Sequence, residues 1–141
     1  DGVVYAVVVS LGFATLENIL YVFDGGLKVA VLRACTAVPA HAAFGVMMGY
    51  GYASYRFHFG GKQSSPAAVL LVPVLAHGLY DAPLFLLQVE SLAEHTVVAL
   101  GLLLAFIALG VWMYRRVRWT MSVLVAGQMS EDAKASLVVD G

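Results

Sequence analysis

The sequence predicts an all-α, polytopic transmembrane helix bundle with four spans. Of its 141 residues, 61% are hydrophobic and only 12% are charged, and the mean hydropathy is +0.85. Soluble domains usually have about a quarter of their residues charged and less than half apolar. The apolar residues also gather in four segments, each near the length of about 20 residues that a helix needs to cross a bilayer. Four strands could not close a barrel, so helices are the only element that fits.

Each predicted span ends at polar or turn-forming residues. The spans cover residues 2–23, 29–55, 66–89 and 96–114. They are followed in turn by the sequences DGGLK, RFHFGGKQSS, ESLAEH and RRVRW. Residues 1–119 therefore form the expected transmembrane domain. In the second span Gly45, Gly49 and Ala53 recur every four positions, which predicts a face for close packing against a neighbouring helix.

The basic residues give the bundle an expected orientation. One side of the predicted membrane has Arg56, Lys62, Arg115, Arg116 and Arg118, and the other has only Lys28 and Arg33. The positive-inside rule then places residues 56–65 and the C-terminus in the cytoplasm, with residues 24–28 and 90–95 outside. Arg33, near the outer boundary, is expected to extend its side chain towards the lipid headgroups.

The C-terminal segment has no features of a span. Residues 120–141 have neither the length nor a clear period, and we expect a cytoplasmic tail with partial disorder. The chain begins at Asp1 without a signal peptide, and we interpret it as an internal piece of a longer protein. A net charge of −1 and the lack of a Gly-rich phosphate loop argue against a nucleic-acid partner.

Ionisable residues inside three of the spans need an explanation, because each costs roughly 2.5–3.5 kcal/mol near the bilayer centre. Glu17 lies in the first span, His41 in the second, and His77 and Asp81 in the third, whereas the fourth span has none. His77 and Asp81 share a helix face, because they are four residues apart. With the orientation above, all four residues lie in the outer half of the membrane, which predicts one shared polar pocket.

Three prolines mark the same depth as these residues. Pro39 precedes His41 by two positions, and Pro73 and Pro83 flank the pair formed by His77 and Asp81. Proline frees a backbone carbonyl and kinks a helix, which can admit water to a polar pocket. The alternative for each proline is a plain structural kink.

Carboxylates and imidazoles around a wet pocket are typical of general acid–base hydrolysis. Glu17 would take a proton from water while a histidine polarises or protonates the reacting amide. The zinc motif HExxH is absent, although His and Asp side chains can still form a metal site. A proton-coupled transporter also buries such relays, and an inactive scaffold or a structural pairing of Glu17 with Arg33 is a further alternative. The residues alone do not separate these classes.

Two short motifs carry a resemblance to a known family. FATLE, residues 13–17, and HGLYD, residues 77–81, match the patterns FxxxE and HxxxD. With these motifs and their flanks, residues 1–90 resemble the PrsW family of intramembrane proteases, relatives of the CAAX prenyl protease superfamily. The family's first motif, EExxK, is missing from the sequence. The family places it just upstream of the point where this chain begins, so we interpret the chain as truncated at its N-terminus.

The resemblance implies a function and a set of site residues. Glu17, His77 and Asp81 would be catalytic, with His41 assisting, in an endopeptidase of the cell membrane of a bacterium or archaeon. Its partners would be membrane lipid and single-span substrates such as anti-sigma factors, cut near the outer side of the membrane. Because the family is often called a metalloprotease, zinc is a candidate cofactor with those four residues as candidate ligands. We favour a water activated by glutamate and histidine, without a cofactor.

Overall fold

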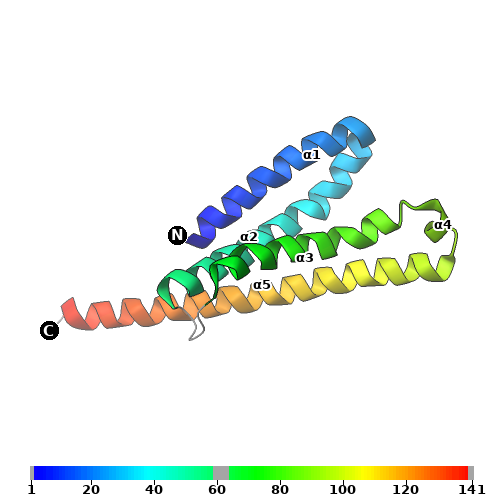
Figure 1. Ribbon diagram of the computed structural model, residues 1–141. Helices are drawn as coiled ribbons and strands as arrows, with labels where there is room; N and C mark the ends of the chain where they lie inside the picture. Colours follow the sequence, from blue (N-terminus) through cyan, green and yellow to red (C-terminus); the bar gives the residue numbers. More distant parts are fainter. Residues whose placement is uncertain (1, 59–63, 140–141) are drawn as a thin grey trace.

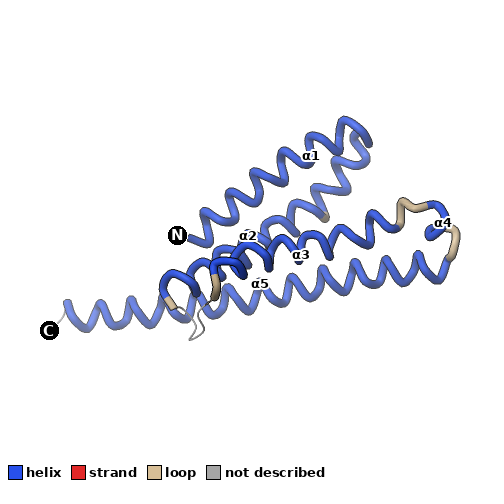
Figure 2. Tube along the Cα trace, in the orientation of Figure 1, coloured by secondary structure: helices blue, strands red, loops and turns tan. Residues whose placement is uncertain are grey.

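The chain forms a bundle of helices joined by short connections (Figures 1 and 2). The computed structural model describes residues 2–58 and 64–139, and no strand occurs among them. The helices are α1 (Gly2–Cys35), α2 (Ala37–Phe57), α3 (Pro66–Leu86), α4 (Glu90–Ala93) and α5 (Thr96–Val139). The predicted all-α class is confirmed.

The element α1 is a hairpin of two helical limbs rather than one straight helix. Its backbone leaves the helical region only at Gly26, where φ is 69° and ψ is −166°. This conformation is essentially restricted to glycine, because a Cβ atom would clash there. Figure 1 shows the chain reversing near this point, so that the second limb returns beside the first. The predicted loop at residues 24–28 is therefore a tight reversal inside α1, and the expected boundaries at residues 23 and 29 are wrong in detail.

A second interruption separates α1 from α2 at Thr36. Pro39 explains it, because a proline ring has no N–H to donate and clashes with the carbonyl four residues earlier, here Cys35. The predicted span 29–55 consequently consists of the second limb of α1 followed by α2. The hydroxyl of Thr36 donates to the carbonyl of Leu32 (2.8 Å), which satisfies one group at the break.

Two glycines bring α2 close to the first limb of α1. A Cβ atom added to Gly45 would lie 2.6 Å from the Cα of Val7, and one added to Gly49 would lie 2.6 Å from the Cα of Val3. Distances this short leave no room for a side chain, so the backbones pack directly against each other. The close-packing face predicted from the spacing of small residues is confirmed at both glycines.

The helix α2 lies at the centre of the bundle, in contact with α1, α3 and α5. The core cluster joins α2, α3 and α5 through Ala40, Phe44, Ala76, Tyr80 and Met113. The helix α3 begins at Pro66 as predicted, with the side chain of Ser65 accepting a hydrogen bond from the Ala68 amide, and ends three residues earlier than expected. It remains one helix although Pro73 and Pro83 lie inside it.

Among the described residues, three helices are long and apolar enough to cross a membrane. They lie within Gly2–Cys35, Pro66–Leu86 and Thr96–Ser130. The helix α2 is not one of them, so the predicted count of four spans is not confirmed. Large apolar side chains are widely exposed on the bundle, such as Phe23 at 84% and Val97 at 83%, as expected of surfaces that face lipid.

The C-terminal segment, which was expected to be a partly disordered tail, is helical, and this corrects the sequence prediction. Instead of ending at Tyr114, the last helix continues through the basic residues as α5 to Val139, and residues 140–141 lie outside the described part. No proline follows Pro83, and most residues of this segment are good or neutral helix formers. A drop in hydropathy marks the end of a membrane span, but it does not end a helix.

The ends of the elements agree with one part of the predicted orientation. Figure 1 shows the tip of the α1 hairpin and α4 at the same end of the bundle, as expected of residues 24–28 and 90–95. The start of α1, the end of α2 and the start of α3 lie towards the other end. Which end faces the outside of the cell stays a prediction.

Substitution of Gly45 by alanine should destabilise the bundle. The added Cβ would meet the Val7 backbone, so we expect the free energy of unfolding to fall by about 1–3 kcal/mol, the usual cost of overpacking. Denaturant titration of the purified protein in detergent measures this. Gly101→Ala on α5 is the matched control, because no heavy atom lies within 4 Å of its added Cβ. Equal stabilities for the two variants would contradict the close packing.

The orientation can be measured with cysteine labelling in intact cells. We expect Ser91→Cys, in α4, to react with an impermeant maleimide, and Gln128→Cys, in the exposed part of α5, to react only after lysis. The native thiol of Cys35 is exposed and should first be replaced by serine. Labelling of residue 128 but not of residue 91 in intact cells would reverse the orientation.

Candidate active site

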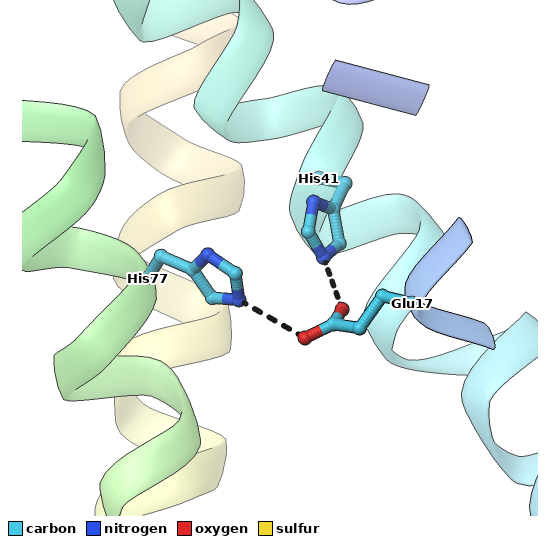
Figure 3. A group of neighbouring side chains, drawn as sticks. All are labelled: Glu17, His41 and His77. Carbon is cyan, nitrogen blue, oxygen red and sulfur yellow. Dashed lines mark hydrogen bonds and ion pairs between the residues drawn. The ribbon is translucent and has the colours of Figure 1, made fainter. Parts of the chain in front are cut away.

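The carboxylate of Glu17 is the centre of the polar cluster. Its Oε2 atom accepts from Nη2 of Arg33 at 2.6 Å and lies 3.0 Å from Nε2 of His41. Its Oε1 atom lies 3.9 Å from Nε2 of His77 (Figure 3). The side chain of Glu17 is only 17% exposed, so the protein supplies most of the polar contacts that this charge needs.

The hairpin of α1 and the start of α2 place His41 beside Glu17. The hydroxyl of Ser10, on the first limb, donates to the carbonyl of His41 at 2.6 Å and fixes the register between the two helices. The side chain of His41 is 3% exposed, and its ring lies against Phe13 and Phe44, each with centroids 5.7 Å away. His41 is therefore held on all sides, with its Nε2 atom directed at the carboxylate.

His77 and Asp81 form the pair that their spacing predicts. Nε2 of His77 lies 3.0 Å from Oδ2 of Asp81, one turn along α3, and the two side chains are 25% and 21% exposed. The same Nε2 atom also faces Glu17 across 3.9 Å, a separation at which a bridging water can lie. The structure thus brings all four predicted site residues into one cluster. Their catalytic roles stay a prediction.

Aromatic rings enclose the two histidines. His41 and His77 meet edge to face with ring centroids 4.7 Å apart, and Phe44 stacks on His77 at 5.1 Å. Phe13, the first residue of FATLE, packs against both imidazoles. The hydroxyl of Tyr80, on α3, donates to the carbonyl of Thr36 at the break between α1 and α2 (3.2 Å). This contact ties α3 to the hairpin one turn away from His77.

The expected headgroup position of Arg33 is wrong. Its side chain is 13% exposed and points into the cluster, where Nε donates to Oδ1 of Asn18 at 2.6 Å and Nη2 donates to Glu17. The guanidinium also lies over the ring of Tyr21, 4.0 Å from its centroid. The pairing of Arg33 with Glu17, an alternative left open by the sequence, is confirmed. Asn18 directly follows Glu17 in an apolar segment, and the sequence does not indicate Arg33 as its partner.

A cavity of about 560 Å³ lies beside the cluster, between the tip of the hairpin and the C-terminal half of α3. Arg33, Tyr80 and Asp81 line it on the side of the cluster. Its apolar lining includes Val29, Leu32, Leu84 and Phe85. A polar group in this cavity could therefore contact Arg33 and Asp81 while apolar side chains surround the rest of it.

Comparisons with known proteins identify the family of the chain. The model of the PrsW family, described as intramembrane metalloproteases, matches residues 1–113. The chain belongs to the PrsW family. Both motifs that suggested the family lie in the matched part, and Glu17, His77 and Asp81 are their ionisable residues.

Curated PrsW relatives cover only part of the same region. The Protease PrsW of Oceanobacillus iheyensis is 44% identical over 81 residues, which are 57% of this chain and 38% of the relative. The Bacillus subtilis protein is 46% identical over 82 residues (57% and 38%), and the Clostridioides difficile protein 38% over 97 residues (64% and 39%). The chain thus spans about two fifths of the length of these relatives. No solved structure matches it.

The family is described as metalloproteases, which raises the question whether the polar cluster around Glu17 fits a metal ion. One ligand atom from each of Glu17, His41 and His77 lies within 4.8 Å of the others. Two imidazoles and one carboxylate are a donor set of catalytic zinc sites, whose ligand atoms lie about 3.3 Å apart around the ion. The nitrogens of His41 and His77 lie 3.0 and 3.9 Å from the two different oxygens of Glu17, so the three residues are a candidate donor set for zinc. Asp81 is outside the triad and contacts it through His77.

Proposed function

We propose that this chain carries a hydrolytic site of an intramembrane endopeptidase that cleaves single-span membrane proteins. The convergence of Glu17, His41 and His77 from α1, α2 and α3 is the observation that carries the proposal. Burial of ionisable groups in an apolar bundle costs free energy. A role in function explains their presence better than a gain in stability does. Membership of the PrsW family favours peptide hydrolysis over a proton-coupled transporter or an inactive scaffold.

The side chains supply both halves of acid–base hydrolysis. In a site without a metal, Glu17 would accept a proton from a water molecule as the water oxygen attacks the carbonyl carbon of the peptide bond. An imidazole then donates a proton to the amide nitrogen as the C–N bond breaks. His77 suits this role because it is the more exposed histidine and lies against the carboxylate of Asp81. The buried His41 orients Glu17 instead.

The convergent donors favour zinc over a site without a metal. In the sequence only His77 and Asp81 lie close together, which favoured a site without a metal, but the fold brings Glu17, His41 and His77 together. Glu17, His41 and His77 would then hold the ion instead of acting as base, orienting group and acid. A bound zinc ion would acidify a water ligand and polarise the substrate carbonyl.

The cavity beside the cluster supports a peptide substrate that enters from the hairpin end of the bundle. Its apolar lining suits a segment that emerges from a membrane span, and Arg33 and Asp81 offer polar contacts to the exposed backbone. With the orientation expected from the loop charges, this end faces outward. We therefore place the cut near the outer side of the cell membrane, in single-span proteins such as anti-sigma factors.

Removal of the reacting groups should abolish cleavage. In the complete protein we expect Glu17→Gln and His77→Ala to lower kcat at least about 100-fold, the usual contribution of an acid or base. Cleavage of a single-span reporter in liposomes measures this. His95→Ala is the matched control, because His95 is exposed and lies outside the cluster. Turnover like the wild type in either site variant would remove that residue from the mechanism.

Zinc in the triad should be measurable directly. We expect stoichiometric zinc in the purified complete protein, lost in His41→Ala and retained in His95→Ala, because only the former removes a donor. Elemental analysis gives the metal content, and activity should disappear on chelation and return with added zinc. Full activity after exhaustive chelation would instead support a water activated by glutamate and histidine alone.

A further inference from the structure

Arg33 makes the shortest contacts of the cluster without belonging to either family motif. Its Nη2 and Nε atoms each donate at 2.6 Å, to Glu17 and to Asn18. The face of its guanidinium covers the ring of Tyr21 at 4.0 Å. Two directed bonds and one stacking contact fix the plane of the group as well as its position.

We propose that Arg33 is a positioning residue of the hydrolytic site, which fixes the carboxylate of Glu17 so that Oε1 faces His77. This inference rests on the proposed function of the cluster. Arg33 and His41 both contact Oε2, and Oε1 is left directed at Nε2 of His77. The gap of 3.9 Å between these two atoms is where a water molecule or a metal ion would bind.

The anchoring of Arg33 explains why this task suits arginine. Asn18 follows Glu17 directly on the first limb of α1, so the guanidinium bonds two adjacent side chains of one helix from the opposite limb. The bond to Asn18 fixes the guanidinium, so that its Nη2 atom, together with Nε2 of His41, holds Oε2 of Glu17 in place. An ammonium group is a point charge on a flexible stem and offers no planar fork. Carboxylates that take part in catalysis or bind metal are commonly oriented in this way.

The position of Arg33 also makes the proposal testable by chemical rescue. Its side chain lines the cavity of about 560 Å³, so truncation to alanine would leave a space that joins this cavity. A free guanidinium ion has the charge and shape of the group removed, and it can reach the space through the cavity. Urea has nearly the same shape without the charge.

The experiment measures cleavage of a single-span reporter by Arg33→Ala in the complete protein. We expect kcat to fall about 100-fold at unchanged KM, because misplacement of a reacting group by about 1 Å has effects of this size. Guanidinium at non-denaturing concentrations should restore part of kcat in a saturable manner, and should raise the unfolding temperature of the variant, whereas urea should do neither. Arg56→Ala, which removes an exposed arginine at the end of α2, should retain kcat and show no response.

Two further variants separate positioning from a structural role. Asn18→Ala removes one of the two anchors and should lower kcat less than Arg33→Ala does, again at unchanged KM. Arg33→Lys retains the charge without the fork, and we expect an intermediate kcat. If Arg33→Ala does not fold, Arg33→Lys decides the question: a reduced kcat at unchanged KM supports positioning, and a kcat equal to that of the wild type overturns it.

Other results would overturn the positioning role of Arg33 or the proposed function itself. Folded Arg33→Ala with full kcat overturns the proposal while the proposed function stands. A variant that loses folded protein but retains full kcat per folded molecule assigns Arg33 to stability alone and overturns positioning. Equal restoration of kcat by guanidinium and by urea also overturns positioning. A complete wild-type protein that cleaves no membrane substrate contradicts the proposed function, and the role of Arg33 in it falls as well.

Discussion

The burial of one carboxylate organises the bundle. Glu17 is largely withdrawn from solvent in an apolar protein, and an unpaired charge there would cost several kcal/mol. The second limb of α1 contributes Arg33, α2 contributes His41, and α3 brings His77 within reach. Residues from α1, α2 and α3 are therefore linked at a single side chain. The polar cluster is at once the condition for burying Glu17 and the site of the proposed chemistry.

The small residues of α2 set the register that makes these contacts. Because Gly45 and Gly49 pack directly on the backbone of the first limb, the facing positions of the two helices are fixed along their length. The reversal at Gly26 then brings Arg33 opposite Glu17, while the bond from Ser10 holds the carbonyl of His41. A polar site with contacts of 2.6 to 3.0 Å thus depends on packing between groups that are themselves apolar.

The sequence predicted the parts of the site that follow from the cost of burying polar groups. Ionisable residues in three apolar segments had to share a pocket, and the spacing of His77 and Asp81 gave their contact directly. It could not predict the role of Arg33, because a side chain that reaches the headgroups and one that turns inward occur in the same hydropathy pattern. The extent of α5 was missed for a related reason, since hydropathy reports burial in lipid and not the continuation of a helix.

The triad consists of two residues fixed by the packing of α1 against α2 and a third supplied by α3. Glu17 and His41 belong to α1 and α2, whose backbones touch, and Arg33 restrains the carboxylate from the same hairpin. His77 depends on α3, which meets α2 through rings such as Phe44 and meets the break between α1 and α2 through the bond from Tyr80 to the carbonyl of Thr36. That carbonyl accepts this bond at the interruption that Pro39 imposes between the helices. Thr36 lies at the break between α1 and α2, so the same break provides a contact that holds α3, and with it His77, against the first two helices.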